Sequence, residues 1–374
     1  MSLQQEFPLK HDLIYLNHAA VSPWPKRTSQ AVMQFAEENT TSGSLNYPTW
    51  LAVESHLRDQ LRQLINAPSS SDIALLKNTS EALSVVAYGL DWQRNQNVVI
   101  SDEEFPSNCI VWESLRSQGV EVRKAKLSSV HLSPEDALIS LCDRNTRIMS
   151  ISSIQYASGL RLDLNTLGQY CRDHNILFCV DAIQSVGAVQ FDVQQANIDF
   201  AMADGHKWML GPEGLAFFYT SANVREKLKL TQFGWHMVEH MGDYDRSDWS
   251  IAGDSRRFEC GSPNMLGIHA LSASISLLLE IGISTVEAQI LQRSAHITDH
   301  LRARNNITLL SVPEEKRRGG IVTFKHTRQP VESLYKLLTD NQVACAMRGG
   351  GIRFSPHFYT PMEKIQRALD LLPD

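Results

Sequence analysis

The sequence is poor in cysteine, and its cysteines form no pattern that binds metal or pairs into disulfides. There is no CxxC pair and no metal-like His/Cys spacing among the 374 residues. We therefore expect reduced thiols, most of which pack in the interior, and no metal site. The six cysteines are Cys109, Cys142, Cys171, Cys179, Cys260 and Cys345.

Long apolar runs and clusters of basic residues are also missing. No apolar run approaches the ~20 residues of a membrane span, and the N-terminus has neither the basic region nor the apolar core of a signal peptide. The formal net charge is −6, and lysine and arginine form no cluster. This balance argues against nucleic acid or an anionic membrane surface as the main partner. We expect a cytoplasmic protein.

The motifs GxGxxG, GxxxxGK[ST] and GxSxG are absent as well. Their absence argues against the dinucleotide-binding, nucleoside-triphosphate-binding and hydrolase versions of an α/β fold. Six apolar runs alternate with helical patterns such as 164–173, which predicts an α/β fold with a mostly parallel sheet covered on both faces. The runs begin near Ile73, Val98, Arg147, Ile176, Phe200 and Leu215.

Lys207 lies between two apolar runs, 200–203 and 215–219, that both have the character of buried strands. The segment between them should form a loop at the strand ends, where α/β enzymes hold their catalytic groups. Flanked by His206 and Trp208, the lysine is expected to be partly removed from water. Such burial lowers the pKa of the amine and makes it a nucleophile for an aldehyde. The alternative is a solvated surface lysine.

A carboxylate ends another of the apolar runs. The run 176–180 leads directly to Asp181. A carboxylate at the end of a buried strand is costly unless a cation or a hydrogen-bond donor pairs with it. A protonated pyridine nitrogen would serve as that partner.

The surroundings of these two groups resemble those of a known family. The segments Asp181-Ala-Ile-Gln-Ser-Val-Gly187 and Asp204-Gly-His-Lys-Trp-Met-Leu-Gly-Pro-Glu-Gly214 are similar to segments of the pyridoxal-phosphate enzymes of the class V aminotransferase family. That family includes cysteine desulfurases, selenocysteine lyases, kynureninases and isopenicillin N epimerase-like proteins. The resemblance implies fold type I, with a seven-stranded, mostly parallel sheet, helices on both faces and a smaller α+β C-terminal domain. It also implies pyridoxal phosphate as the cofactor and a homodimer with shared active sites.

The resemblance also implies roles for individual residues. Lys207 forms the Schiff base with the cofactor aldehyde, and Asp181 holds the pyridinium nitrogen protonated. The protonated ring is the electron sink for negative charge at the α-carbon of the amino acid, and an adjacent carboxylate keeps that proton in place at neutral pH. Lys207, once substrate replaces it, is free to shuttle protons. Gln184 is placed near the cofactor's phenolic oxygen, and His206 is placed beside the cofactor.

A helix start at Asn78 predicts where the cofactor phosphate binds. Asn78 followed three residues later by Glu81 is close to a capping box, so one interpretation is simply a well-capped helix. A helix N-terminus also offers unpaired N–H groups to a phosphate, and Thr79 and Ser80 add hydroxyl donors. The similarity of Asn-Thr-Ser-Glu-Ala to the family's phosphate-binding turn favours the second interpretation.

Two further positions concern the same phosphate. The segment 257–264 is similar to the family's Arg-Phe-Glu-x-Gly-Thr-Pro-Asn, which implies that Ser262 completes the phosphate site of the neighbouring subunit. Asp204 stands where many relatives have serine. An acid next to a phosphate repels it unless the acid is turned away or paired.

Two residues that follow strands are expected to contact the cofactor ring. Phe105 follows the strand 98–101 and is placed to stack on the pyridine face, with a core phenylalanine as the alternative. The Phe-Pro pair resembles the kynureninase and epimerase-like branches more than the ordinary desulfurases. Gln155 follows the strand 147–154 and is a candidate ligand to the phenolic oxygen.

Three residues are expected on the substrate side. Arg353 lies in an expected strand, and its planar guanidinium suits a substrate α-carboxylate, with an interior ion pair as the alternative. The resemblance to the family's Arg-x-Ser-x-x-x-Tyr segment favours the carboxylate. Asn17 and His18 lie in a segment similar to the one that reaches over the active site in this family, although a loop histidine satisfied by the protein is equally consistent with the pattern.

The chain is expected to divide into a large cofactor-binding domain, 25–255, and a small domain made of 1–24 and 256–374. The expected activity is that of an aminotransferase or a cysteine desulfurase-like lyase on a small α-amino acid, and an amino-acid epimerase is the alternative. An alternative of another class is a non-catalytic α/β binding module, in which Lys207 and Asp181 form a structural ion pair.

One departure from the family narrows the chemistry. Ordinary cysteine desulfurases carry a nucleophilic cysteine on a loop before the arginine that corresponds to Arg353. The glycine-rich turn 348–353 contains no cysteine, and Cys345 before it is flanked by small apolar residues that indicate burial. A persulfide on a thiol of this chain is therefore not expected.

Overall fold

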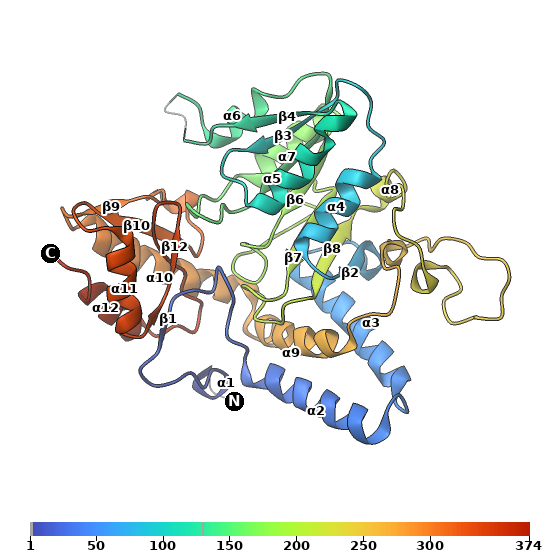
Figure 1. Cartoon of the computed structure of the whole chain (residues 1–374), viewed down its shortest axis with the longest axis horizontal. Helices are drawn as coiled ribbons and strands as arrows, with labels where there is room; N and C mark the ends of the chain where they lie inside the picture. The colour runs from blue at the N-terminus through green and yellow to red at the C-terminus, as the bar shows by residue number, and fades with distance from the viewer. Residues whose placement is uncertain (1–2, 129–130) are drawn as a thin grey trace.

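A seven-stranded sheet forms the centre of the molecule (Figure 1). The computed structural model describes residues 3–128 and 131–374. The strand order is β2-β8-β7-β6-β5-β3-β4, and neighbouring strands are parallel except in the two pairs that contain β8. The strands are β2 (Ile73–Leu76), β3 (Asn97–Ser101), β4 (Glu121–Ala125), β5 (Thr146–Ser152), β6 (Leu177–Asp181), β7 (Phe200–Asp204) and β8 (Ala216–Thr220). The predicted α/β class and mostly parallel sheet are confirmed.

Successive side chains of each strand enter two different apolar cores, because they point to opposite faces of the sheet. In β6, Phe178 and Val180 join one core, whereas Leu177 and Cys179 join the other. All five residues of this strand are buried. A strand covered on both faces gives a continuous apolar run, which is why the sequence pattern predicted it.

β4 is a strand that the sequence pattern did not predict. Its residues are largely charged, and only Ala125 is buried. The strand lies at the edge of the sheet and pairs with β3. An edge strand with exposed charged residues shows no apolar run, so this pattern could not reveal it.

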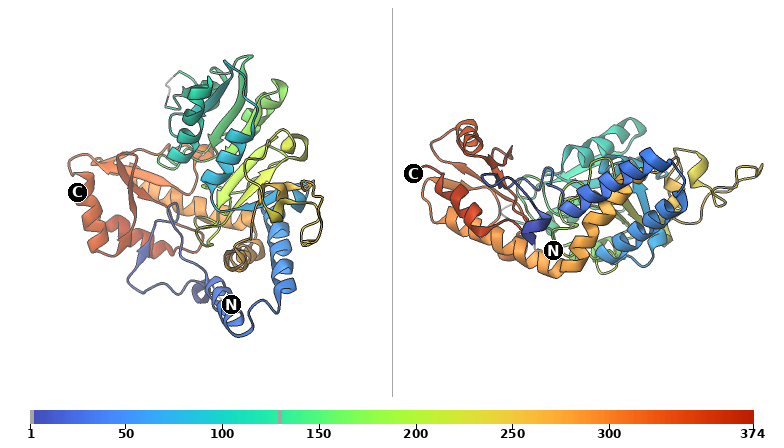
Figure 2. Two further views of the ribbon diagram at one scale, coloured as in Figure 1. Left: turned by 45° about the vertical axis from the view of Figure 1, so that its right-hand side comes forward. Right: turned by 90° about the horizontal axis from the view of Figure 1, so that it is seen from below.

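Helices cover both faces of the sheet (Figures 1 and 2). They are α2 (Lys26–Ser42), α3 (Tyr47–Leu64), α4 (Thr79–Gly89), α5 (Pro106–Glu113), α6 (Pro134–Ile139), α7 (Leu164–Asp173), α8 (Ala222–Arg225) and α9 (Met265–Ile281). Short 3-10 helices are η1 (Ser70–Asp72), η2 (Ser114–Gln118), η3 (Trp235–Met237), η4 (Ser255–Phe258) and η5 (Glu315–Arg317). Helix α9 packs against α2 and α3 and shares a core with the large sheet, although it follows the expected boundary at residue 255. The division at that residue stays a prediction.

The C-terminal part of the chain forms a smaller α+β unit around a four-stranded antiparallel sheet of order β12-β13-β10-β9. Its strands are β9 (Ile307–Leu309), β10 (Val322–His326), β12 (Ala346–Arg348) and β13 (Gly351–Phe354). Its helices are α10 (Ile283–Arg302), α11 (Val331–Asp340) and α12 (Met362–Asp370). This arrangement confirms the predicted smaller α+β part.

The first residues of the chain pack onto this C-terminal unit. After the short helix α1 (Leu3–Glu6), strand β1 (Ile14–Tyr15) pairs in parallel with β11 (Val343–Ala344). Asn17 continues the pairing through an isolated bridge to Ser355. A few residues later, the backbone N–H of Ser22 donates to the oxygen of His206 at 2.8 Å. The N-terminal segment therefore connects the small unit to the segment that contains Lys207.

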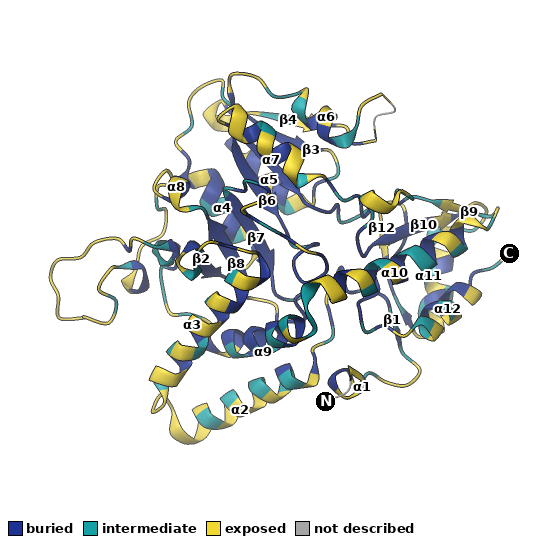
Figure 3. Ribbon diagram, turned by 180° about the vertical axis from the view of Figure 1, so that it is seen from behind, coloured by how far each residue is buried: buried dark blue, intermediate teal, exposed yellow. Residues whose placement is uncertain are grey.

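A long segment between α8 and α9 extends away from the body of the molecule (Figures 1 and 3). It was expected to form a loop, and apart from η3, η4 and one bridge between Val238 and Ile251 it has no regular structure. Large apolar side chains are exposed along it, including Phe233, Tyr244 and Trp249.

No single helix among the described residues is long and apolar enough to cross a membrane. Helices α9 and α10 meet that test only as a pair, which is bent by 84°.

Candidate active site

Lys207 lies just beyond the carboxyl end of β7, in residues 205–214, here called the Lys207 loop. The loop is closed by backbone hydrogen bonds from Gly205 N to Leu215 O and from Gly211 N to Gly205 O. Lys207 is only 9 % exposed, and its Nζ lies 5.5 Å from the centroid of the Phe105 ring. The lysine is therefore held in the interior beside an aromatic face.

The turn after β6 packs directly on the Lys207 loop. Gly187 has a φ of +91°, and a Cβ at this position would lie 2.4 Å from the backbone oxygen of Trp208. Only glycine combines this backbone conformation with such a close approach. Trp208 is fully buried, and its Nε1 donates to Oε1 of Gln184 at 2.8 Å. The two family-like segments of the sequence therefore form one packed unit.

Burial controls the charge of the two central groups. It lowers the pKa of Lys207 to about 8, although the carboxylate of Asp181 opposes the change. It raises the pKa of Asp181 to about 7, opposed by the N–H of Ile183 and by the charge of Lys207. The charges of Arg353 and Arg348 also lower the pKa of Lys207. Such perturbed groups are typical of functional sites.

The lowered pKa of Lys207 leads to a prediction. Only the neutral amine attacks an aldehyde, and the neutral fraction rises with pH until the pKa is passed. In cofactor-free protein, the rate at which Lys207 reacts with pyridoxal phosphate is expected to rise about tenfold per pH unit below pH 8 and to level off above it. Stopped-flow absorbance measures this rate. The control is Nα-acetyl-lysine, whose side-chain amine is free and fully solvated. A rate that keeps rising to pH 10 contradicts the prediction.

Asp181 ends β6, and Gln184 lies in the turn that follows. Asp181 is 2 % exposed, and its Oδ1 accepts a hydrogen bond from Ile183 N at 3.0 Å. The amide of Gln184 donates from Nε2 to the oxygen of Ala19 at 3.1 Å and accepts from Trp208 through Oε1. One of the two Nε2 protons remains for a ligand. A contact from Gln184 to the cofactor's phenolic oxygen stays a prediction.

Gln155 is fully buried three residues after the end of β5, and it is held by an acid that sequence reasoning missed. Its Nε2 lies 3.4 Å from Oε1 of Glu104, whereas its Oε1 has no partner. Glu104 is itself buried and accepts hydrogen bonds from Ser101 and Ser152. Glu104 is the third of three consecutive acids that follow β3, and an acid directly after an apolar strand, the signal used for Asp181, would have identified Asp102 in its place. The ligand role of Gln155 stays a prediction.

Helix α4 begins with the cap that its sequence predicted. Oδ1 of Asn78 accepts from Glu81 N at 2.8 Å, and Oε2 of Glu81 accepts from Lys77 N at 2.7 Å. The first helical residue, Thr79, donates from both its N–H and its Oγ1 to Oδ2 of Asp204, each at 3.1 Å. Asp204 is thus paired with the helix end and not turned away from it.

Two other residues complete the surroundings of this helix end. Ser80 is exposed, and its Oγ shares a hydrogen bond of 2.8 Å with Ser107. Nδ1 of His206 lies 3.9 Å from Oδ1 of Asp204 and has no hydrogen-bond partner. Burial lowers the pKa of His206, and the charge of Asp204 opposes this effect. Cofactor contacts of Ser80 and His206 stay predictions.

Arg353 is a buried cation on the central part of β13. It is 2 % exposed, its Nη1 donates to the oxygen of Tyr156 at 2.8 Å, and its Nε has no partner. Burial and the charge of Arg348 lower the pKa of Arg353 to about 10. No carboxylate of the described residues forms an ion pair with it. Arg353 therefore does not form the interior ion pair that was the alternative, as far as the described residues show.

The two N-terminal candidates differ in what they offer to a substrate. His18 is fully buried, with Nδ1 at 2.8 Å from the oxygen of Ser355 and Nε2 at 2.8 Å from the hydroxyl of Tyr359. Burial lowers the pKa of His18 to about 3. Both ring nitrogens are thus used within the protein. Oδ1 of Asn17 is buried without a partner and is available to a ligand. Substrate contacts of either residue stay predictions.

Ser262 does not meet the other predicted residues within one chain. It is exposed and lines a surface pocket of about 380 Å³ together with Lys77 and Glu81. Its expected role requires a second copy of the protein and stays a prediction.

Unsatisfied polar atoms are common among the predicted site residues. Ten buried side-chain nitrogen and oxygen atoms of the described residues have no hydrogen-bond partner. Four of them belong to predicted site residues, namely Asn17 Oδ1, Gln155 Oε1, His206 Nδ1 and Arg353 Nε. Unpaired buried polar atoms are costly, so these groups are suited to a polar ligand.

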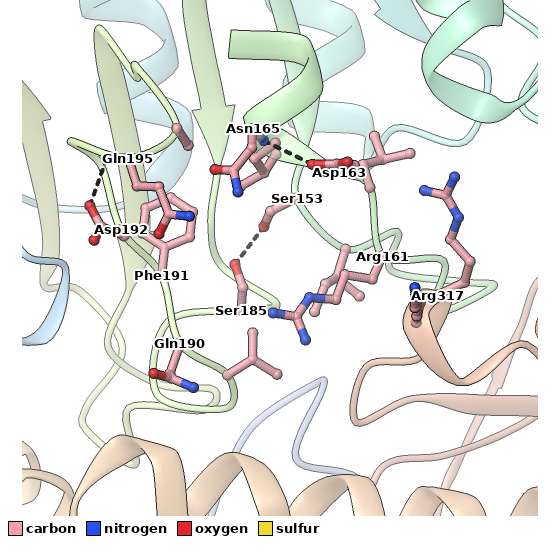
Figure 4. Close-up of a pocket in the computed structure, with 16 residues that line it drawn as sticks. Ser153, Arg161, Asp163, Asn165, Ser185, Gln190, Phe191, Asp192, Gln195 and Arg317 are labelled. Carbon is pink, nitrogen blue, oxygen red and sulfur yellow. Dashed lines mark hydrogen bonds between the residues drawn. The ribbon is translucent and has the colours of Figure 1, made fainter. Parts of the chain in front are cut away.

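A nearby cavity differs from the site in this respect. It encloses about 580 Å³, and Figure 4 shows Arg161 reaching into it opposite Ser153 and Ser185. Arg161 is paired with Glu287, and Arg317 on the cavity wall is paired with Glu135. None of the ten unsatisfied atoms belongs to its lining. The cavity therefore has no comparable need for a ligand.

Comparison with known proteins identifies the family. The Aminotransferase class-V profile matches residues 14–367. A probable cysteine desulfurase of Methanothermobacter thermautotrophicus is 29 % identical over 97 % of this chain and 95 % of its own length. A C-DES variant with glycine covalently linked to its PLP cofactor has a TM-score of 0.90, with 20 % identity and 98 % of each chain covered. The cystine C–S lyase C-DES in complex with cysteine persulfide has a TM-score of 0.89, with 20 % identity over 97 % and 98 % of the two chains.

The two structures show that the chain has the fold predicted for it, fold type I. Because the profile covers nearly the whole sequence, the chain belongs to the aminotransferase class-V family. The prediction of a pyridoxal-phosphate-dependent enzyme is confirmed at the level of this family.

Proposed function

We propose that this enzyme cleaves a small, cysteine-like α-amino acid with the help of pyridoxal phosphate. One observation carries the proposal. The site contains a buried lysine, Lys207, and a buried arginine, Arg353, that has no counter-ion among the described residues. Lys207 offers a partly neutral amine, and Arg353 offers a desolvated cation whose charge lowers the pKa of that amine. An aldehyde for the first and a carboxylate for the second are the groups that satisfy them.

The residues present fit the cofactor. Lys207 would hold its aldehyde carbon, Asp181 its ring nitrogen, Phe105 its ring face, and the N-terminus of α4 with Ser80 its phosphate. The open hydrogen-bonding capacity of Gln155 and Gln184 suits further polar atoms of the ring. When bound, the cofactor supplies an electron sink for negative charge at the substrate α-carbon.

The chain's own groups perform the remaining work. Arg353 binds the substrate carboxylate and so fixes which α-bond is activated. Asp181 keeps a proton on the ring nitrogen because its buried carboxylate is stabilised by an adjacent cation. Lys207 takes up the α-proton and delivers a proton to the departing sulfur, since a group with a pKa near 8 exchanges protons readily at neutral pH.

The sulfur chemistry is proposed to involve no thiol of the chain near Arg353. Cys345 is 5 % exposed, and burial raises its pKa to about 12. Such a thiol stays protonated and is a poor nucleophile. We therefore favour β-elimination, in which the α-proton and the sulfur substituent both leave the substrate, over transfer of sulfur to a protein cysteine. The similarity to the cystine C–S lyase supports this choice.

Product analysis tests the proposal. Purified enzyme loaded with pyridoxal phosphate is incubated with cysteine and with cystine, and the products are separated. Pyruvate and ammonia, formed with sulfide or cysteine persulfide, are expected. Alanine with sulfane sulfur indicates desulfurase chemistry, and a 2-oxo acid that retains the sulfur indicates amino transfer. Inversion at the α-carbon without cleavage supports the epimerase alternative, and no reaction with any amino acid supports the binding module.

Replacing Arg353 by alanine is expected to raise KM for the amino acid about 10- to 100-fold. The reason is the loss of a charge-assisted, bidentate interaction of roughly 1.5–3 kcal/mol. Steady-state kinetics measures the change. Arg353→Lys keeps the charge but cannot form the bidentate interaction, so its KM should lie between those of the wild type and Arg353→Ala. The affinity for pyridoxal phosphate should change little. An unchanged KM removes Arg353 from the substrate site.

We also propose that the enzyme is a homodimer with shared active sites. The exposure of Ser262 and of the apolar side chains along 233–251 supports it, because both are suited to contact a second copy. Light scattering measures the mass in solution, and a monomer at all concentrations removes this proposal.

A further inference from the structure

We propose that Asp204 competes with the cofactor phosphate for the N-terminus of α4 and thereby weakens cofactor binding. This inference rests on the proposed use of pyridoxal phosphate. It assigns Asp204 a role as a determinant of cofactor affinity, because the carboxylate occupies donors that a phosphate would otherwise use.

The hydrogen bonds of Thr79 show that donors at the start of α4 are already occupied. The first turn of a helix has N–H groups without partners inside the helix, and these groups bind phosphates. In α4 the N–H and the hydroxyl of Thr79 both donate to Oδ2 of Asp204 at 3.1 Å. Two of the predicted phosphate donors are therefore already bonded to a resident anion. A phosphate at this helix end must displace that anion or share the remaining donors with it.

The surroundings of Asp204 compensate its negative charge only weakly. Asp204 is 7 % exposed, so water screens its charge poorly. Among the described residues, the groups that compensate its charge are Thr79, the His206 ring with Nδ1 3.9 Å away, and the charge of Lys207. Lys77 is exposed and lies 3.5 Å from Glu81. A dianionic phosphate would thus share the helix end with a second, weakly compensated negative charge.

A comparison of two ligands isolates the effect of the phosphate. Pyridoxal phosphate and pyridoxal both carry the aldehyde, but only the first carries a phosphate. Asp204→Asn removes the charge and retains an oxygen that can accept from Thr79. The dissociation constants of both ligands are measured on cofactor-free protein by visible absorbance and by quenching of tryptophan fluorescence. These readouts need no turnover.

The expected result is specific to the phosphate. Asp204→Asn should bind pyridoxal phosphate about tenfold or more tightly than the wild type, because repulsion between two buried charges is removed. Its affinity for pyridoxal should change less than twofold. The matched control is Glu213→Gln, which removes the same charge from an exposed position of the Lys207 loop. This control should change neither constant more than twofold.

Three outcomes overturn the inference. Equal or weaker binding of pyridoxal phosphate by Asp204→Asn shows that the carboxylate does not oppose the phosphate. Equal gains for both ligands place the effect elsewhere in the site. If the wild type binds neither ligand, the proposed cofactor fails together with the inference. Asp204→Ser, which carries the residue of many relatives, repeats the comparison should the asparagine variant not fold.

Discussion

Replacing Lys207 by alanine is expected to abolish the visible absorption that pyridoxal phosphate acquires on this protein and to reduce turnover at least ~10³-fold. Lys207 is buried at the carboxyl end of β7, beside Phe105 and within the influence of Asp181 and Arg353. The alanine side chain has no amine, so the variant offers neither a nucleophile for the cofactor aldehyde nor a base for the α-proton.

The measurement is a titration of cofactor-free wild type and variants with pyridoxal phosphate, followed by absorbance. Lys207→Arg is the matched control, because it retains a cation of similar length but has no amine nucleophile. Both variants should lose the absorption, whereas thermal unfolding should show that both are folded. Persistence of the absorption band in Lys207→Ala would assign the link to another lysine and remove the central premise of the proposed function.

Replacing Asp181 by asparagine is expected to lower kcat about 10²- to 10⁴-fold, within the range that a group controlling one proton contributes. The amide has no charge to retain a proton on the ring nitrogen, so the ring accepts negative charge less well. The carboxylate is fully buried, and burial raises its pKa to about 7. A bound cation would return it to the ionised state.

Asp199 provides a matched control for this experiment. It directly precedes β7 at the amino end of that strand, whereas Asp181 lies at the carboxyl end of β6, and Oδ2 of Asp199 accepts from Phe178 N at 2.9 Å. Burial raises its pKa as well. Steady-state kinetics of Asp199→Asn should therefore show kcat within about twofold of the wild type. If the two variants lose activity equally, Asp181 acts through the stability of the sheet and not through the cofactor.

The sheet was predictable wherever the chain is buried on both faces. β6 and β7 consist of five buried residues each, and their apolar runs mark them clearly in the sequence. β4 was not predicted, because it is a charged strand at the edge of the sheet. The domain limit was harder to place, since α9 has apolar residues on most sides and its packing partners α2 and α3 lie more than 200 residues earlier.

The roles of single residues were predictable where the side chain allows few kinds of chemistry, as for lysine and aspartate in a buried position. A lysine and an acid at the ends of buried strands indicated a site, and the structure buries both Lys207 and Asp181. Hydrogen-bond partners were not predictable, because they depend on residues distant in sequence. Sequence alone could not show that His18 is satisfied by Ser355 and Tyr359, or that Asp204 is held by Thr79.

The parallel pairing of β1 with β11 affects how the site is completed during synthesis. His18 and Ser355, which are hydrogen-bonded, are separated by 337 positions in the sequence. Because a ribosome releases the N-terminus first, residues 14–18 must wait until residues 342–355 have emerged before they can pair. The large sheet can form earlier, since its strands end at residue 220. The N-terminal segment that borders Lys207 is therefore among the last parts of the nascent protein to reach its final place.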